Sequence, residues 1–124
     1  MKFTSTGLIL CTEKYEDCVD FYANKIGLSI LHSYDNEHSK LTALDMGGNS
    51  YLMVEPGGKA IPEGKTMDDN PVWIRFNVEN IDAAVTELRD RGVTAKIRRE
   101  VWGTVADFCD PDGNVCSLRE AGSF

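Results

Sequence analysis

The chain has 124 residues, of which 42% are hydrophobic and 27% are charged, a composition typical of a globular protein. A formal net charge of −7 argues against nucleic acid as a partner, and the sequence has no apolar run long enough for a membrane helix. The start, MKFTSTG, lacks the apolar core of a signal peptide, so we expect a cytoplasmic protein that contacts no membrane.

The first half of the chain predicts a β-α-β-β-β series. A strand with alternating Leu8 and Leu10 precedes a helix, whose apolar residues follow the i, i+3, i+4, i+7 spacing of one helix face: Tyr15, Cys18, Val19 and Tyr22. Thr12 is placed to cap this helix and Gly27 to end it. A strand over 29–34 and a hairpin around the run Asp45-Met46-Gly47-Gly48-Asn49 complete the series.

A linker is predicted over Pro56 to Pro71, because this stretch carries three of the four prolines together with three glycines. Either half alone would be too small for its own core. We therefore expect one domain over residues 1–124, with a first repeat over about 1–56, the linker over about 57–70 and a second repeat over about 71–124.

The second half repeats the series at an offset of 66 residues. Ile74 and Phe76 correspond to the first strand, Asn80 is placed as the helix cap, and the helix has the matching apolar positions Ile81, Ala84, Val85 and Leu88. A strand over 94–101 follows, and then the turn sequence DPDGN, Asp110 to Asn114, sits between two apolar stretches. The doubling predicts an α+β fold, in which two β-α-β-β-β repeats form one cupped, eight-stranded mixed sheet with the helices on its outer face.

Strand alternation predicts which side chains enter the cup. In the second repeat, Trp73 and Arg75 point inward while Ile74 points to the helix, and in the last strand Ser117 points inward. In the first strand, Gly7 points inward. The four cysteines have no CxxC spacing and are expected to be buried or half-buried thiols rather than metal ligands.

The chain resembles the vicinal oxygen chelate superfamily, which contains glyoxalase I, extradiol dioxygenases, fosfomycin-resistance enzymes and bleomycin-resistance binding proteins. The resemblance covers nearly the whole chain. It is carried by Phe21-Tyr22 followed by Ile26-Gly27-Leu28, by the stretch from Phe76 to Val93, and by DPDGNVCSL from Asp110 to Leu118. These residues imply the fold but no single function, since the fold hosts enzymes and binding proteins alike.

In the enzymes of this family, His, Gln or Glu side chains on four strands hold a divalent metal. The resemblance places these positions at Gly7, Trp73, Ser117 and a fourth residue, which is Leu52 by the internal repeat or Met53 by the family motif. None of these side chains is a ligand for Zn²⁺, Ni²⁺ or Fe²⁺. Glu55 shares a face with Met53, but one carboxylate binds a metal weakly. We therefore expect no metal and no other cofactor.

The cup instead offers groups suited to an organic ligand. Trp73 is placed to stack on a planar molecule and Arg75 to bind a carboxylate or phosphate. The register that puts Met53 inside adds the hydroxyl of Tyr51, and Trp102 is placed at the rim. Each has an alternative: Trp73 plugs the cup or an interface, Arg75 pairs with Glu55 or Asp45, and Trp102 is only a strand-end feature.

These residues predict a small-molecule binding protein of the glyoxalase/bleomycin-resistance type, which sequesters a planar or cationic ligand in the cup without a metal. The expected ligand-binding residues are Tyr51, Glu55, Trp73, Arg75, Trp102 and Ser117, and no residue is assigned as catalytic. The alternative is a metal-dependent lyase or dioxygenase of the glyoxalase I type with atypical ligands, so enzymatic activity stays an open question. The resemblance also implies a homodimer.

Overall fold

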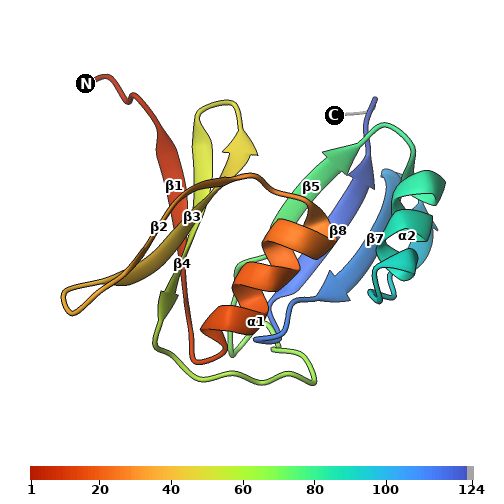
Figure 1. Cartoon of the computed structure of the whole chain (residues 1–124). Helices are drawn as coiled ribbons and strands as arrows, with labels where there is room; N and C mark the ends of the chain where they lie inside the picture. The colour runs from red at the N-terminus through yellow and green to blue at the C-terminus, as the bar shows by residue number, and fades with distance from the viewer. Residues whose placement is uncertain (123–124) are drawn as a thin grey trace. The chain divides into compact units, whose positions relative to one another are not determined.

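The computed structural model describes residues 1–122, which fold as two compact units: a first unit, Met1–Ala60, and a second unit that begins at Ile61. Each unit is a β-α-β-β-β series, as predicted (Figure 1). Over the described residues, hydrogen bonds divide the eight strands into two mixed sheets of four rather than one continuous sheet. The reason is that β1 and β5 are edge strands whose outer sides pair with no strand of the described chain.

The sheet of the first unit has the strand order β1-β4-β3-β2, in which β1 runs parallel to β4 and the other neighbours are antiparallel. Its elements, in chain order, are β1 (Thr6–Thr12), α1 (Tyr15–Asp20), the π-helical segment η1 (Phe21–Ile26), β2 (Ile30–Asp35), β3 (Lys40–Gly47) and β4 (Ser50–Pro56).

The helical segment of the first unit buries the face that the spacing predicted, including Tyr15, Cys18 and Tyr22. It ends at Gly27, which has a φ of 94°, a conformation that glycine adopts without strain. The predicted cap at its start is wrong. Lys14 occupies the cap position without a side-chain bond, and the hydroxyl of Thr12 instead accepts a hydrogen bond from the N–H of Lys14 at 3.0 Å.

The sheet of the second unit repeats this topology with the order β5-β8-β7-β6. Its elements are β5 (Ile74–Val78), α2 (Ile81–Asp90), β6 (Lys96–Glu100), β7 (Gly103–Cys109) and β8 (Val115–Glu120). The predicted cap is confirmed here, since the Asn80 side chain accepts a hydrogen bond from the N–H of Ala83 at 3.0 Å. Helix α2 packs on the sheet through the buried Ile81 and Leu88.

The two turns that look like copies in the sequence have different structures. In the first unit Asp45 lies inside β3, and the chain reverses at Gly48 and Asn49, whose φ angles are 56° and 60°. Positive φ at both central residues is the requirement of a tight type I′ hairpin. In the second unit the whole run from Asp110 to Asn114 lies between β7 and β8. The run around Asp45 is therefore not a structural copy of DPDGN.

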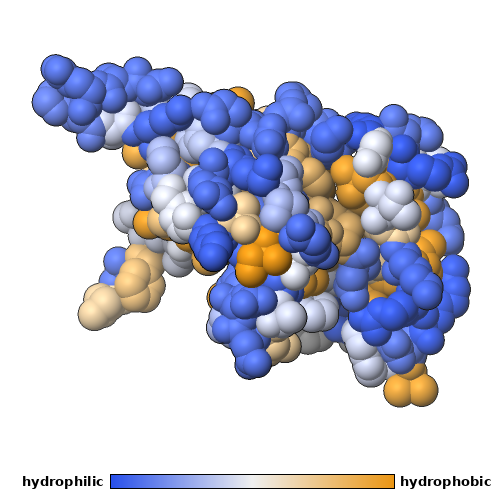
Figure 2. Space-filling view, turned by 90° about the horizontal axis from the view of Figure 1, so that it is seen from below, coloured by the Kyte–Doolittle hydropathy of each residue, from blue (hydrophilic) through white to orange (hydrophobic). Residues whose placement is uncertain are grey.

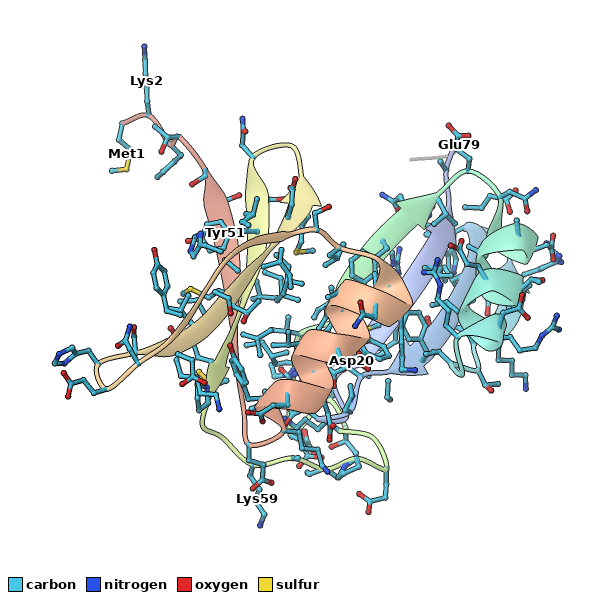
Figure 3. All side chains as sticks on the ribbon, viewed as in Figure 1. Met1, Lys2, Asp20, Tyr51, Lys59 and Glu79 are labelled. Carbon is cyan, nitrogen blue, oxygen red and sulfur yellow. The ribbon has the colours of Figure 1, made fainter. Side chains whose placement is uncertain are left out.

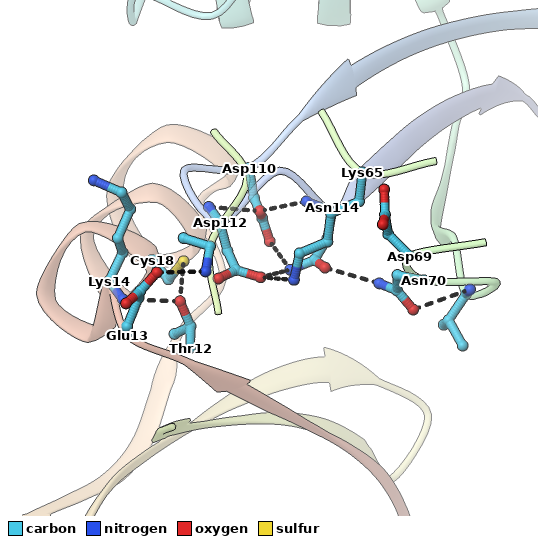
Figure 4. Close-up of polar contacts among 12 residues, drawn as sticks. Thr12, Glu13, Lys14, Cys18, Lys65, Asp69, Asn70, Asp110, Asp112 and Asn114 are labelled. Atoms are coloured by element: carbon cyan, nitrogen blue, oxygen red, sulfur yellow. Dashed lines mark hydrogen bonds and ion pairs between the residues drawn. The ribbon is translucent and has the colours of Figure 1, made fainter. Parts of the chain in front are cut away.

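The DPDGN turn is a buried polar cluster rather than an exposed loop (Figure 4). The Asp110 carboxylate accepts hydrogen bonds from the backbone N–H groups of Asp112 and Asn114, at 3.0 and 2.9 Å. The Asn114 amide donates to the carboxylates of both Asp110 and Asp112, at 3.0 and 2.9 Å. These bonds satisfy carboxylates that are almost fully buried, as buried polar groups require.

The segment that follows Ile61 is docked on this turn, although the sequence identified it only as a linker. The ammonium group of Lys65 forms an ion pair with the Asp112 carboxylate, and the Asn70 amide donates to the Asn114 side-chain oxygen at 2.8 Å. The N–H of Ile61 also donates to the carbonyl oxygen of Asp112. The turn therefore fixes both the β7–β8 hairpin and the segment that leads to β5.

The cysteine prediction is right for two residues and wrong for two. Cys18 and Cys116 are buried, whereas Cys11 and Cys109 are exposed, because both lie where strands reach the sheet margin. None of the helices within residues 1–122 has the length and apolar character needed to cross a membrane. In the space-filling view, hydrophilic residues cover most of the visible face, with hydrophobic residues in small groups among them (Figure 2).

Candidate functional site

The face of the second sheet opposite α2 carries the row predicted along β5. Ile74 is 4% exposed, whereas its neighbour Trp73 is 43% exposed and Arg75 is also exposed, as strand alternation requires. In the ladder Arg75 lies opposite Ser117 of β8. The structure thus brings Arg75 and Ser117 together on one face, with Trp73 directly before the strand.

Ser117 belongs to a chain of polar contacts on this face. It is fully buried, and its hydroxyl donates a hydrogen bond to Asp107 of β7 at 2.7 Å. The other oxygen of the Asp107 carboxylate accepts a hydrogen bond from Arg98 of β6 at 2.6 Å. The hydrogen bond to Asp107, and then the negative charge of this carboxylate, raise the pKa of Arg98. Sequence reasoning missed Asp107 and Arg98, because only the ladder register shows that they face Ser117.

Arg75 differs from the other two arginines on this face. Arg98 is paired with Asp107 and Glu100, and the guanidinium of Arg119 donates to the carbonyl oxygen of Trp102 at 2.9 Å. Among the described residues of the second unit, the side chain of Arg75 forms no hydrogen bond and no ion pair. Its five N–H donors are therefore available to an anionic group.

Trp102 lies in the turn between β6 and β7 and remains 49% exposed. The guanidinium carbon of Arg119 lies 5.4 Å from the centre of the indole ring, the geometry of a cation–π contact. Gly103 makes this close approach possible, since a β-carbon there would come within 3.1 Å of the Arg119 guanidinium. Trp102 is thus held in place by Arg119, a residue that sequence reasoning did not assign to the site.

The structure of the first sheet shows which residues of β4 point to its open face, a choice between Leu52 and Met53 that the sequence left undecided. Leu52 is fully buried on the side of α1, whereas Tyr51, Met53 and Glu55 are half-buried on the opposite face. The assignment of Leu52 to the cup is therefore wrong and that of Met53 holds. Glu55 lies opposite Cys11 in the β1–β4 ladder and forms no ion pair within the described residues.

Tyr51 covers the first-strand position of the family's metal site. It lies beside β1, opposite Gly7 in the parallel ladder (Figure 3). A β-carbon at Gly7 would overlap the Tyr51 ring carbons Cε2 and Cζ and would lie 2.7 Å from Cδ2. The ring therefore occupies the space into which a ligand side chain at residue 7 would extend.

A pocket of about 550 Å³ lies in the first unit at the end of the sheet that carries the β3–β4 turn. The residues that line it include His32, Asp45, Asn49 and Tyr51. Of these residues, sequence reasoning assigned only Tyr51 to a site. The others escaped notice because β2 and the β3–β4 turn carry no recognisable ligand motif.

The residues at the family's metal positions do not fit a divalent metal. Gly7 has no side chain, Trp73 is an indole, the Ser117 hydroxyl is bound to Asp107, and Met53 offers only a thioether. Over residues 1–122, no group of three or more His, Cys, Asp and Glu side chains is arranged to hold a metal ion. The six predicted site residues instead form two groups, with Tyr51 and Glu55 in the first unit and the other four in the second.

Comparison with known proteins places this arrangement in context. A family model described as the Glyoxalase/Bleomycin resistance protein/Dioxygenase superfamily matches residues 5–118. The uncharacterized protein YetH of Bacillus subtilis (strain 168) is 29% identical over 112 residues, which cover 87% of this chain and 90% of that protein.

Solved structures share the fold at lower identity. TnmS3, an antibiotic binding protein from Streptomyces sp. CB03234, is 22% identical with a TM-score of 0.75, and the match covers 98% of each chain. A member of the same superfamily from Sphaerobacter thermophilus DSM 20745 is 21% identical with a TM-score of 0.73, again over 98% of each chain. At these identities the likeness shows the fold of the chain.

Proposed function

This chain belongs to the Glyoxalase/Bleomycin resistance protein/Dioxygenase superfamily, and from that premise we propose that it is a binding protein for a planar or cationic small molecule. The ligand is held by side chains on the open faces of the sheets, without a metal. Each unit is proposed to offer its own contacts: Trp73, Arg75 and Trp102 in the second unit, and Tyr51 and Glu55 in the first. Ser117, which is fully buried, is proposed to act through its hydrogen bond to Asp107.

The observation that carries this proposal is the chemistry at the family's metal positions. The Tyr51 ring fills the space above Gly7, and the Ser117 hydroxyl is committed to Asp107. Trp73 and Arg75 instead present an exposed indole and a guanidinium that is unpaired within residues 1–122. Aromatic and guanidinium groups suit an organic ligand, which they recognise by stacking and by bidentate hydrogen bonds.

Two further features support the proposal. TnmS3, which has the same fold, is an antibiotic binding protein, so the fold supports binding of organic molecules. The net charge of −7 favours the approach of a cationic molecule over an anionic one. The proposal includes a homodimer, as the family resemblance suggests. It also includes a cytoplasmic location, a reducing compartment in which cysteines are kept as thiols.

The experiment uses the two tryptophans of the chain. In the variant Trp102→Phe, Trp73 is the only tryptophan, and its fluorescence reports on its own surroundings. We expect saturable quenching on titration with N-methylquinolinium, a planar cation. The matched variant Trp73→Phe, which retains Trp102, tests whether the quenching belongs to Trp73.

Metal analysis accompanies this titration. Protein purified without chelator and dialysed is expected to hold far less than one Zn, Ni, Mn or Fe per chain. One equivalent of any of these metals, retained after dialysis, would contradict the proposal. So would quenching of the same size in Trp73→Phe, because the ligand would then lie elsewhere.

A further inference from the structure

We propose that the pocket beside Tyr51 in the first unit is a subsite for an organic ammonium group, with Asp45 as its counter-ion. The inference rests on the proposed function, because Tyr51 belongs to both, and it deepens it by naming the chemical class of one part of the ligand. The occupant is a small molecule with a quaternary or primary ammonium group attached to a short apolar portion.

The ladder sets Asp45 and Tyr51 side by side. The two residues are directly opposite each other in the antiparallel β3–β4 pair, on the open face of the sheet. Opposite side chains in such a pair have β-carbons only about 5 Å apart. Both residues line the pocket, so an acidic and an aromatic residue are available to one occupant.

The Asp45 carboxylate is oriented but not neutralised. One of its oxygens accepts a hydrogen bond from the N–H of Gly47 at 2.7 Å, which fixes the side chain. Among the described residues of its unit, Asp45 forms no ion pair, and no lysine or arginine belongs to the pocket lining. The charge is thus available to a ligand, and an anion would be repelled.

The remaining walls suit the uncharged part of such a ligand. The Tyr51 ring rests on the backbone at Gly7 and lines the pocket, so it presents a fixed aromatic surface, the kind that attracts quaternary ammonium groups. Leu31, which also lines the pocket, is 52% exposed and offers apolar surface. Choline is a simple probe for this combination, because it joins a quaternary ammonium group to a short uncharged chain.

The turn keeps the pocket open. Gly47 and Gly48 line it with positive φ angles, and a β-carbon at either would meet nothing within 4 Å. The two glycines therefore give the tight turn its conformation and leave space above it. Their amide N–H groups also report on occupancy, because they lie in the pocket wall.

The test compares choline with 3,3-dimethylbutan-1-ol, which has the same shape but a carbon atom in place of the charged nitrogen. ¹H–¹⁵N spectra are recorded during titration with each probe. Choline is expected to shift the amide signals of Gly47, Gly48 and Asn49 saturably, with an affinity at least tenfold higher than that of the neutral probe. Equal affinity for the two probes would overturn the assignment.

The variant Asp45→Asn removes the charge but keeps an oxygen that accepts from the N–H of Gly47. It is expected to weaken choline at least tenfold and to leave the neutral probe unchanged. Asp35→Asn, at the end of β2 and outside the pocket, makes the same charge change and is expected to leave choline binding unaltered. An equal loss in both variants would contradict a specific role of Asp45.

A failure of the subsite and a failure of the proposed function give different results in these experiments. If choline fails to bind while N-methylquinolinium still quenches Trp73, only the subsite is wrong. If choline binds at Asp45 and no planar molecule quenches Trp73, the subsite stands and the proposed role of Trp73 is wrong.

Discussion

The ring of Tyr51 lies directly against Gly7, in the space where any other residue at position 7 would carry its side chain. Glycine at this edge-strand position therefore has a packing reason, since the cross-strand ring covers the backbone that glycine leaves bare. The same contact occupies the first-strand position of the family's metal site. One pair of residues thus fixes the Tyr51 ring, whose residue lines the pocket of the first unit, and removes a ligand position.

The first prediction concerns this pair. Gly7→Ala is expected to push the Tyr51 ring from its place and to lower the free energy of unfolding by about 1 to 3 kcal/mol, the usual cost of overpacking. In a Tyr51→Ala background the same change is expected to cost much less, because no ring is displaced. Urea unfolding of the four proteins of this double-mutant cycle measures the coupling. Additive effects would show that ring and glycine do not interact.

The second prediction concerns the pair that docks the segment after Ile61. The Asp112 side chain is fully buried and that of Lys65 is only 13% exposed. Lys65→Met leaves the Asp112 carboxylate buried without its cation, so we expect a loss of about 3 to 5 kcal/mol in the free energy of unfolding. The matched control is Arg99→Gln, since Arg99 and Asp82 are paired at 3.5 Å with both side chains well exposed.

Thermal or urea unfolding of the two variants distinguishes the buried pair from the exposed one. Arg99→Gln is expected to leave stability nearly unchanged, because solvent screens its pair. If Lys65→Met were as stable as the control, the polar cluster at DPDGN would not depend on the docked segment.

The third prediction concerns thiol reactivity. Burial, and then the nearby charge of Asp110, raises the pKa of the Cys109 thiol. The residue is exposed as a whole, yet its Sγ lies close to Gly64, where a β-carbon would come within 3.6 Å. A raised pKa lowers the thiolate fraction at pH 8, so Cys109 is expected to react with iodoacetamide several-fold more slowly in the folded protein than in urea.

Mass spectrometry of tryptic peptides measures the reaction. Cys109 and Cys116 share the tryptic peptide from Glu100 to Arg119, so fragment ions of this peptide are needed to give the rate for Cys109 alone. When the alkylation rate of Cys109 is measured from pH 7 to pH 10, the pH at half-maximal rate should be higher in the folded protein than in the unfolded chain. A folded-state rate equal to or faster than the unfolded rate would show that neither burial nor Asp110 protects this thiol.

The fourth prediction concerns Ser117, where the family's enzymes place an acidic residue. Ser117→Glu would bury a second carboxylate beside Asp107, so it is expected to destabilise the protein more at pH 7 than at pH 4, where a carboxyl group takes up a proton. Ser117→Ala, the control, loses the hydrogen bond to Asp107 and the longer contact with the Leu118 carbonyl oxygen, at about 1 kcal/mol. Stoichiometric zinc binding by Ser117→Glu would contradict our conclusion that the neighbouring positions do not fit a metal.

Hydrophobic periodicity was sufficient to predict the order of the elements and several buried residues, but not the exposure of Leu8, Cys11 and Cys109. Local patterns alone predicted that Ile74 is buried while Trp73 is exposed, and that Asn80 caps the second helix. The structure confirms both predictions. The cap at Thr12 failed because the first helix begins at Tyr15, which puts Lys14 and not Thr12 at the cap position. Helix ends depend on a few hydrogen bonds, which spacing alone does not reveal.

The register of β4 shows where the internal repeat misleads. Leu8 and Ile74 are 66 residues apart, but their ladder partners, Leu52 and Cys116, are only 64 apart. The two halves differ in length at their turns. The run from Asp45 lies 65 residues before DPDGN, and subtracting 65 from Ser117 gave Leu52, which points to the wrong face. The contact between Ser117 and Asp107 was missed for a related reason, since it follows from pairing between β7 and β8 rather than from spacing.

Binding without a metal is the claim that decides between a binding protein and a metal-dependent enzyme. Isothermal titration of N-methylquinolinium into the protein, with and without EDTA, tests it most directly. We expect the same affinity and stoichiometry in both titrations, because the proposed contacts are side chains alone. Binding that disappears in EDTA and returns with one equivalent of a divalent metal would contradict it.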